Sequence, residues 1–175
     1  VEQNPKDAMP RVWLGNLRLV KGERDEAEQV FRDAVKQFPD DPRVWNGLIL
    51  LLVRTQQNDE VRQVLQELTS QPNLPDATRH FMAGQGYELL GDVDEAKKQY
   101  EAAVQSAPEN TAIRLRYAKL LLASDVVAAR SQLEQIVQRD PKNDEARRRL
   151  ATLLASSGSD EDWNRAFQLL RQSDA

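Results

Sequence analysis

The chain has 175 residues, of which 30 % are charged, and a formal net charge of −4 at neutral pH. This mildly acidic balance gives no general attraction to nucleic acid or to a membrane surface. The absence of cysteine excludes disulfides and thiolate metal sites and leaves the redox compartment open. No apolar run approaches the roughly 20 residues that a membrane-spanning helix needs.

The first clear element follows Gly22, in the segment GERDEAEQVFRDAVKQFPDD. Ala27, Phe31 and Ala34 fall at i, i+4 and i+7, which is the spacing of one face of an α-helix. Pro39 then ends the helix, because proline has no backbone N–H to donate inside it. The segment therefore predicts a turn followed by an amphipathic helix.

The same pattern returns 69 residues later in the chain. The five positions then carry residues of the same or a similar kind, namely Gly91, Ala96, Tyr100, Ala103 and Pro108. One more copy lies between these two, with a first helix that contains Trp45 and Leu48 and a degenerate second helix at residues 58–68. A period of about half that distance predicts a helical-repeat solenoid.

These residues resemble the tetratricopeptide repeat, a helix pair of about 34 residues with Trp, Leu-Gly and Tyr in its first helix and Ala, Phe and Pro in its second. Further matches in the first helices are Leu14-Gly15, Trp45, Leu48, Ala83-Gly84 and Tyr87. The resemblance implies an all-α fold, a right-handed α-solenoid of antiparallel helix pairs with about four and a half repeats.

We expect a single array over residues 1–175. Its parts are the tail of a preceding repeat at 1–7, four repeats at 8–41, 42–76, 77–110 and 111–143, and a truncated fifth repeat at 144–175. Both ends are expected to be cut from a longer protein, which would open apolar faces for self-association. In the second repeat Gln56 and Val61 replace the usual turn glycine and small alanine, which predicts looser or shifted packing of its second helix.

Catalysis has little support in the sequence, and we expect no enzyme, no cofactor and no metal site. The single histidine, His80, stands where the repeat usually has Trp, which favours a role in helix packing. Carboxylates such as Glu26, Asp92 and Glu95 lie at helix starts, where they satisfy free amides and the helix dipole.

The resemblance implies binding in a concave groove lined by the first helices, whose second, fifth, sixth and ninth residues face it. The peptide-binding candidates mapped in this way are Val12, Trp13, Asn16, Asn46, Leu50, Phe81, Met82, Gln85, Arg116, Lys119, Arg148 and Arg149. The earlier members are largely apolar and the last four are basic, which predicts a peptide or protein partner with apolar anchors and acidic residues.

Structural alternatives stay open for several of these residues. Trp13 would equally pack against an upstream repeat, and neighbouring helices would equally cover Phe81 and Met82. Residues 147–149 are three arginines, a pattern that is most often a solvated helix surface.

The function implied by the resemblance is a protein–protein interaction scaffold that holds a peptide or a partner helix in the concave groove. The alternative is an architectural spacer or self-association module within a larger enzyme or envelope assembly. RNA binding by a related helical-repeat family is disfavoured by an isoelectric point near 5.2 and by the lack of base-stacking aromatic residues in register.

Overall fold

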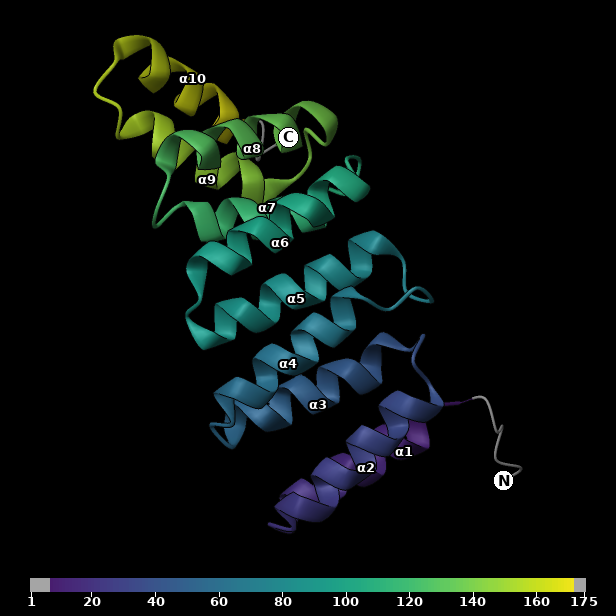
Figure 1. The fold of residues 1–175 in the computed structure, drawn as a ribbon. Helices are drawn as coiled ribbons and strands as arrows, with labels where there is room; N and C mark the ends of the chain where they lie inside the picture. Colours follow the sequence, from purple (N-terminus) through teal and green to yellow (C-terminus); the bar gives the residue numbers. More distant parts are fainter. Residues whose placement is uncertain (1–6, 172–175) are drawn as a thin grey trace. The chain divides into compact units, whose positions relative to one another are not determined.

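The structure is a computed structural model that describes residues 7–171 (Figure 1). This described part contains ten α-helices and no strand. The helices are α1 (Met9–Val20), α2 (Arg24–Gln37), α3 (Pro42–Arg54), α4 (Asn58–Thr69), α5 (Asp76–Leu90), α6 (Val93–Ser106), α7 (Thr111–Leu121), α8 (Val126–Arg139), α9 (Asp144–Ala155) and α10 (Asp160–Arg171). The expected all-α helical-repeat fold is confirmed. The tail expected at residues 1–7 lies outside the described residues, except for Asp7.

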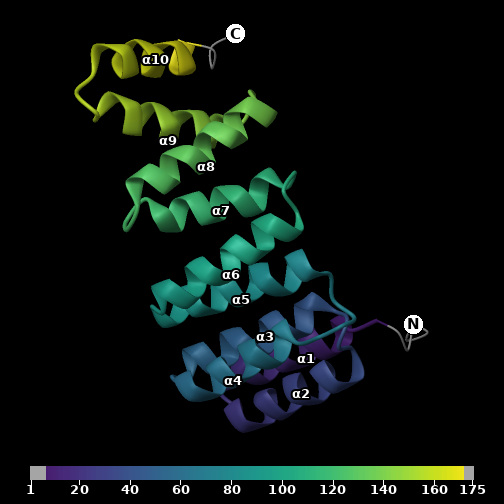
Figure 2. The same cartoon turned by 45° about the horizontal axis from the view of Figure 1, so that its top comes forward.

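Contacts divide the chain into two compact units, one that reaches to Gln99 and one that starts at Tyr100, within α6. In the first unit α1 packs on α2, and α3 packs on both α2 and α4, while α4 packs on α5. The first helix α1 also lies against α3, and α3 against α5. In the second unit α8 packs on α7 and α9, and α9 packs on α10. Consecutive helices within each unit run in opposite directions (Figure 2).

Several helices begin at a side-chain cap. Asp41, Asn110, Asp125 and Asn143 each accept a hydrogen bond from a backbone N–H in the first turn of α3, α7, α8 and α9, respectively. These N–H groups have no partner inside their own helix, so the caps stabilise the point at which each helix starts.

The core of the first unit depends on close contacts between a bulky side chain and a glycine. The ring of Phe31 on α2 is fully buried between Gly15 of α1 and Gly47 of α3. A Cβ atom would lie 2.6 Å from this ring at Gly15 and 2.2 Å from it at Gly47. The two glycines therefore allow α1 and α3 to close on opposite sides of one ring, at the density of a protein interior.

Within its own helix pair, α4 lies less closely against α3 than α2 lies against α1. Gln56 adopts a φ of 59°, in the left-handed region that glycine enters without strain. Val61 and Leu65 are fully buried, and a Cβ atom at Gly86 of α5 would lie 2.4 Å from Leu65. The expectation of looser or shifted packing therefore holds between α3 and α4, while the glycine on α5 brings α5 close to α4 around the larger side chains.

The core of the second unit combines large aliphatic side chains with alanines. Its buried cluster contains Ala118, Leu133, Ile136, Ala146, Leu150, Ala151, Leu154 and Ala166. The alanines allow neighbouring helices to approach closely, and the leucines and Ile136 fill the space between them. The alanines of the repeated pattern, Ala27 and Ala96, and Ala129 at the matching position of α8 are all fully buried.

A side chain in the first turn of a helix binds the carbonyl of the proline that ends the preceding helix pair. Trp45 Nε1 donates to the carbonyl of Pro39 at 2.9 Å. The corresponding contact occurs 69 residues later, where Arg114 donates to the carbonyl of Pro108 at 3.0 Å. A buried arginine therefore replaces the tryptophan donor without leaving the carbonyl unsatisfied.

Arg147 takes a similar place in the first turn of α9. Its side chain is only 5 % exposed and pairs with Asp144, whereas Arg148 is exposed and Arg149 is half-buried. Residues 147–149 are therefore not one solvated surface. Successive residues of a helix point about 100° apart, so the first arginine of the run turns inward.

We expect Gly47→Ala to lower the free energy of unfolding by about 1 kcal/mol. Overpacking costs about 1–3 kcal/mol, and the better helix propensity of alanine offsets up to about 1 kcal/mol of that cost. The Phe31 ring cannot move away, because Gly15 closes its other side. Chemical denaturation measures the change. In a Phe31→Leu background Gly47→Ala should cost less, and equal costs in the two backgrounds would contradict this contact.

Candidate binding surface

A groove lies between α1 and α3 in the first unit, and its cavity volume is about 380 Å³. The residues that line it are Met9, Val12, Asn16, Leu19, Arg43, Asn46, Gly47, Leu50, Leu51 and Arg54. Four of the binding residues predicted from the sequence, Val12, Asn16, Asn46 and Leu50, are brought together here. They come from two first helices that pack directly on each other.

The groove combines apolar side chains with two carboxamides. Leu50 is 42 % exposed and Val12 is half-buried, so both offer apolar surface to a ligand. Asn16 and Asn46 are exposed, and each carboxamide can both donate and accept hydrogen bonds. This mixture suits a ligand that has an apolar side chain and free peptide groups.

Two arginines lie at opposite ends of α3 and both line the groove. Arg43 Nη2 lies 2.6 Å from Asp41 Oδ2, and this contact lowers the pKa of the Asp41 carboxyl and raises the pKa of Arg43. Within residues 7–171 Arg54 forms no ion pair. The uncompensated positive charge of the groove is therefore at the C-terminal end of α3.

Trp13 does not line this groove, although the sequence places it among the binding candidates. Its side chain is 64 % exposed and lies on the same helical stripe as Leu17, which is 52 % exposed. The residue 34 positions after Trp13 is Gly47, which contacts Phe31 of the preceding helix. Trp13 therefore lies on the side of α1 that corresponds to the side of α3 against which α2 packs.

The other candidates of the first unit belong to α5, which lies against α3. Phe81, Met82 and Gln85 are all half-buried. They are partly covered, as the structural alternative holds, but each keeps accessible surface. Their role in peptide binding stays a prediction.

The basic candidates of the second unit are partly neutralised by one carboxylate. Lys119 Nζ lies 3.1 Å from Glu145 Oε1, and Arg149 Nη2 lies 2.8 Å from the same oxygen. The set of four basic residues therefore carries less free positive charge than the sequence alone predicts.

The remaining two basic candidates differ in their contacts. Arg116 Nε donates to the Tyr100 hydroxyl at 3.3 Å. Arg148 is exposed and lines a shallow cavity of about 310 Å³ together with Glu145, Arg149 and Thr152. An acidic group would find its most accessible partner here in Arg148.

The lining residues of the α1–α3 groove that sequence reasoning missed include Leu19 and Arg54. Both follow the mapped positions by about one helical turn, since Leu19 is three residues after Asn16 and Arg54 is four after Leu50. Side chains at i+3 and i+4 share a helix face. Extending the mapped positions by one turn would have found both residues.

Metal and membrane sites find no support in the described residues. Between Asp7 and Arg171 no group of three or more histidine and acidic side chains is placed to hold a metal ion. No helix in that range is long and apolar enough to cross a membrane. His80 Nδ1 lies 2.8 Å from Gln99 Oε1, so the imidazole is engaged in a contact between side chains.

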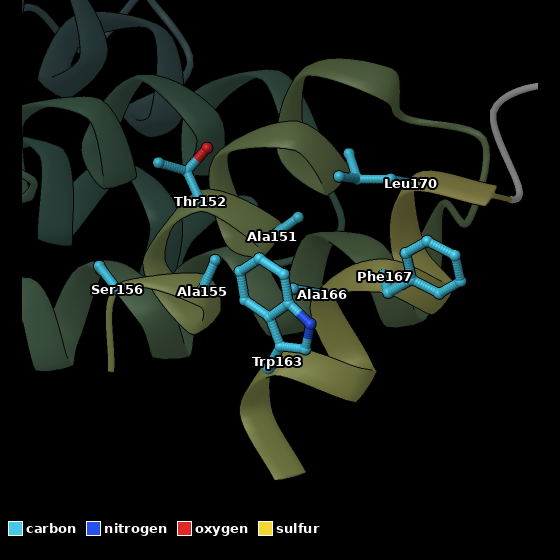
Figure 3. Close-up of a pocket in the computed structure, with 8 residues that line it drawn as sticks. All are labelled: Ala151, Thr152, Ala155, Ser156, Trp163, Ala166, Phe167 and Leu170. Carbon is cyan, nitrogen blue, oxygen red and sulfur yellow. The ribbon is translucent and has the colours of Figure 1, made fainter. Parts of the chain in front are cut away.

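A further cavity, which the sequence did not single out, is lined by residues of α9 and α10. Its volume is about 460 Å³ (Figure 3). The lining residues are Ala151, Thr152, Ala155, Ser156, Trp163, Ala166, Phe167 and Leu170. Small residues of α9 and Ala166 form one part of the lining, and the large side chains of α10 stand around it.

A family model described as tetratricopeptide repeat matches residues 3–137. The chain belongs to the tetratricopeptide-repeat family. Repeats of this family generally mediate protein–protein interaction and are generally non-enzymatic scaffolds.

Solved structures of tetratricopeptide-repeat proteins share the fold. The crystal structure of YrrB, described as having an unusual peptide-binding site, matches with a TM-score of 0.61 at 18 % identity, over 98 % of this chain and 87 % of that chain. The crystal structure of MamA matches with a TM-score of 0.68 at 12 % identity, over 91 % of this chain and 94 % of that chain. Similarity at such low identity shows the fold alone.

A curated relative is cellulose synthase operon protein C of Pseudomonas fluorescens (strain SBW25). It is 26 % identical over 126 residues, which is 68 % of this tetratricopeptide-repeat chain and 10 % of the relative. The chain therefore spans about a tenth of the length of this relative.

The contacts of Glu145 give a titration that tests the geometry of the basic cluster. Hydrogen bonds from Arg149 and then Lys119 lower its pKa from the ordinary 4.5. The charged carboxylate is thus favoured in the folded protein. This stabilisation is present above pH 4.5 and is lost as the pH falls through the lowered pKa.

We expect Arg149→Gln to raise the pKa of Glu145 more than Lys119→Gln does, because Arg149 makes the larger contribution. A carbon-detected NMR titration of the Glu145 carboxyl measures both shifts. Arg148→Gln is the matched control, since Arg148 forms no ion pair within residues 7–171. The same response of Glu145 in all three variants would contradict the contacts.

Proposed function

We propose that the groove between α1 and α3 binds a segment of another protein that carries an apolar anchor. The observation that supports this function is the convergence of Val12, Asn16, Asn46 and Leu50 on one cavity. In this proposal the apolar side chains cover the anchor, and the two carboxamides bind the peptide groups beside it.

The proposed surface continues on α5, which lies against α3 in the same unit. Phe81, Met82 and Gln85 would contact residues of the segment beyond the anchor. An acidic residue of the partner would pair with Arg54 at the end of α3. Such exposed charges mainly speed association and set orientation, so their effect weakens as salt is raised.

A second candidate function is that of an architectural module within a larger protein. It is favoured by the alignment with cellulose synthase operon protein C, of which the matched region is only 10 %. Crosslinking of the full-length protein would separate the two functions. Crosslinks from the groove to a separate protein support the binding function, and crosslinks only to other parts of the same protein support the architectural one.

We expect Leu50→Ala to raise the dissociation rate of a groove-binding peptide by about tenfold, since removal of an apolar anchor contact typically costs more than about 1 kcal/mol. Asn46→Ala should raise it a few-fold, because one hydrogen bond contributes about 0.5–1.5 kcal/mol. Peptides selected from a displayed random library provide the probe, and surface plasmon resonance measures the rates.

Leu89→Ala is the matched control for this experiment. Leu89 is an exposed leucine of the same unit, 52 % exposed, and does not line the groove. Selected peptides that dissociate equally fast from the wild type and from the Leu50→Ala, Asn46→Ala double variant would show that the groove is not the binding site.

A further inference from the structure

Each second helix has an alanine or valine at the small position of the repeat. The residue four positions later is covered by the next helix pair, except in α10. Phe31, Leu65, Tyr100 and Leu133 follow Ala27, Val61, Ala96 and Ala129 in this way, and all four are fully buried. Leu170 stands in the same relation to Ala166 and is 46 % exposed. The outer side of α10 therefore corresponds to the side on which, in the other second helices, the next helix pair packs. No described residue covers it.

The α10 face differs from the internal junctions in one chemical respect. The residue immediately after the small side chain is polar in the preceding second helices, as in Arg62 and Arg130. Arg62 bonds to Asp92 at 2.9 Å, and Arg130 bonds to Asp162 at 2.9 Å, in each case within the following helix pair.

In α10 this position is Phe167, which is 57 % exposed. Trp163, one turn earlier, is 61 % exposed. An apolar side chain cannot take part in the ion pair that the internal junctions use. The face therefore fits a helix whose contact stripe is apolar throughout.

Apart from Trp163, Phe167 and Leu170 of α10 itself, the described chain contains one exposed helix stripe of that kind, on α1. Trp13, Leu17 and Val20 lie at i, i+4 and i+7 and are 64 %, 52 % and 85 % exposed. In α3 the positions 34 residues later are Gly47, which contacts Phe31, and Leu51, which is 1 % exposed. The stripe on α1 thus corresponds to the side with which a first helix packs on the second helix of the preceding pair.

We propose that α1 of one copy of this chain packs on the α9–α10 face of a second copy. Trp13 inserts into the cavity lined by Ala151, Ala155 and Ala166 (Figure 3), and Leu17 covers Leu170. The contact repeats the arrangement of an internal junction, with an aromatic ring against small residues, but the ring belongs to the inserting helix. This proposal is independent of the α1–α3 groove, because Trp13 does not line that groove.

The charges beside the two surfaces agree with this pairing. The helix α1 carries Arg11 and Arg18 and no acidic residue, and Arg18 pairs with Glu23. The first turn of α10 carries Asp160, Glu161 and Asp162, of which Asp162 pairs with Arg130, while Arg165 and Arg171 lie further along α10. Attraction between the two helices would assist association at low salt.

The two surfaces of this contact are different, so the association is heterologous. Each copy that joins leaves one free α1 and one free α9–α10 face, and assembly is not limited to a dimer unless the copies close into a ring. The average mass of the protein should therefore rise with concentration. An association through two identical surfaces would instead stop at the dimer.

Analytical ultracentrifugation of the 175-residue chain over a wide range of concentrations tests the proposal. We expect a mass above 19.9 kDa that rises with concentration for the wild type. Trp13→Glu and Leu170→Glu should each stay at 19.9 kDa, since either change places a charge in the apolar contact. Val127→Glu is the matched control, because Val127 is 81 % exposed and lies on neither surface, and it should associate like the wild type.

An equal mixture of Trp13→Glu and Leu170→Glu tests whether α1 of one copy binds the α9–α10 face of the other. Trp13→Glu keeps an intact α9–α10 face and Leu170→Glu keeps an intact α1, so together they should form a one-to-one dimer and nothing larger. A wild type that is monomeric at every concentration would overturn the proposal, as would a mixture that stays monomeric.

Circular dichroism of each variant establishes that its helices are intact. Leu17→Glu and Phe167→Glu provide a second pair with the same expected outcome, should either of the first variants lose its helical signal. Association that persists in both members of a folded pair also overturns the proposal.

Discussion

The contact between one bulky side chain and a glycine on the next helix is the constraint on which the first unit depends. The Phe31 ring occupies the space that a side chain would need at Gly15 and at Gly47, so three helices meet at one point. Leu65 and Gly86 repeat this contact one helix pair later. A helix pair alone would leave such a side chain in water, and stability is therefore shared between neighbours.

The same constraint determines where a ligand can bind. Because α1 and α3 both close on the Phe31 ring, the groove forms between these two first helices, and Gly47 takes part in both contacts. Apart from Gly47 and Leu51, the residues that line the groove do not belong to the buried core, and they are free to serve recognition. A scaffold in which packing and binding use largely different residues tolerates substitution of the binding residues, as suits a protein-interaction fold.

The two electrostatic features of the chain have different roles. The ion pairs of Arg62 with Asp92 and of Arg130 with Asp162 join one helix pair to the next. They are partly exposed, so each contributes little to stability, but they specify which partner fits. The pairing of Glu145 with Lys119 and Arg149 instead reduces the positive charge of a predicted binding set. At this site Glu145 neutralises two of the basic residues, so Arg148 remains the most accessible of them.

The sequence by itself determined the helix pairs and their small and bulky core positions, because spacing along one helix decides which residues share a face. It also brought Val12, Asn16, Asn46 and Leu50 into one predicted set, which the α1–α3 groove unites. It could not place Trp13, bury Arg147 or pair Lys119 with Glu145. Those outcomes depend on which neighbouring helix covers a face and on distances between side chains far apart in the chain. Only the tertiary structure decided them, because helical periodicity describes one helix and carries no information about its neighbours.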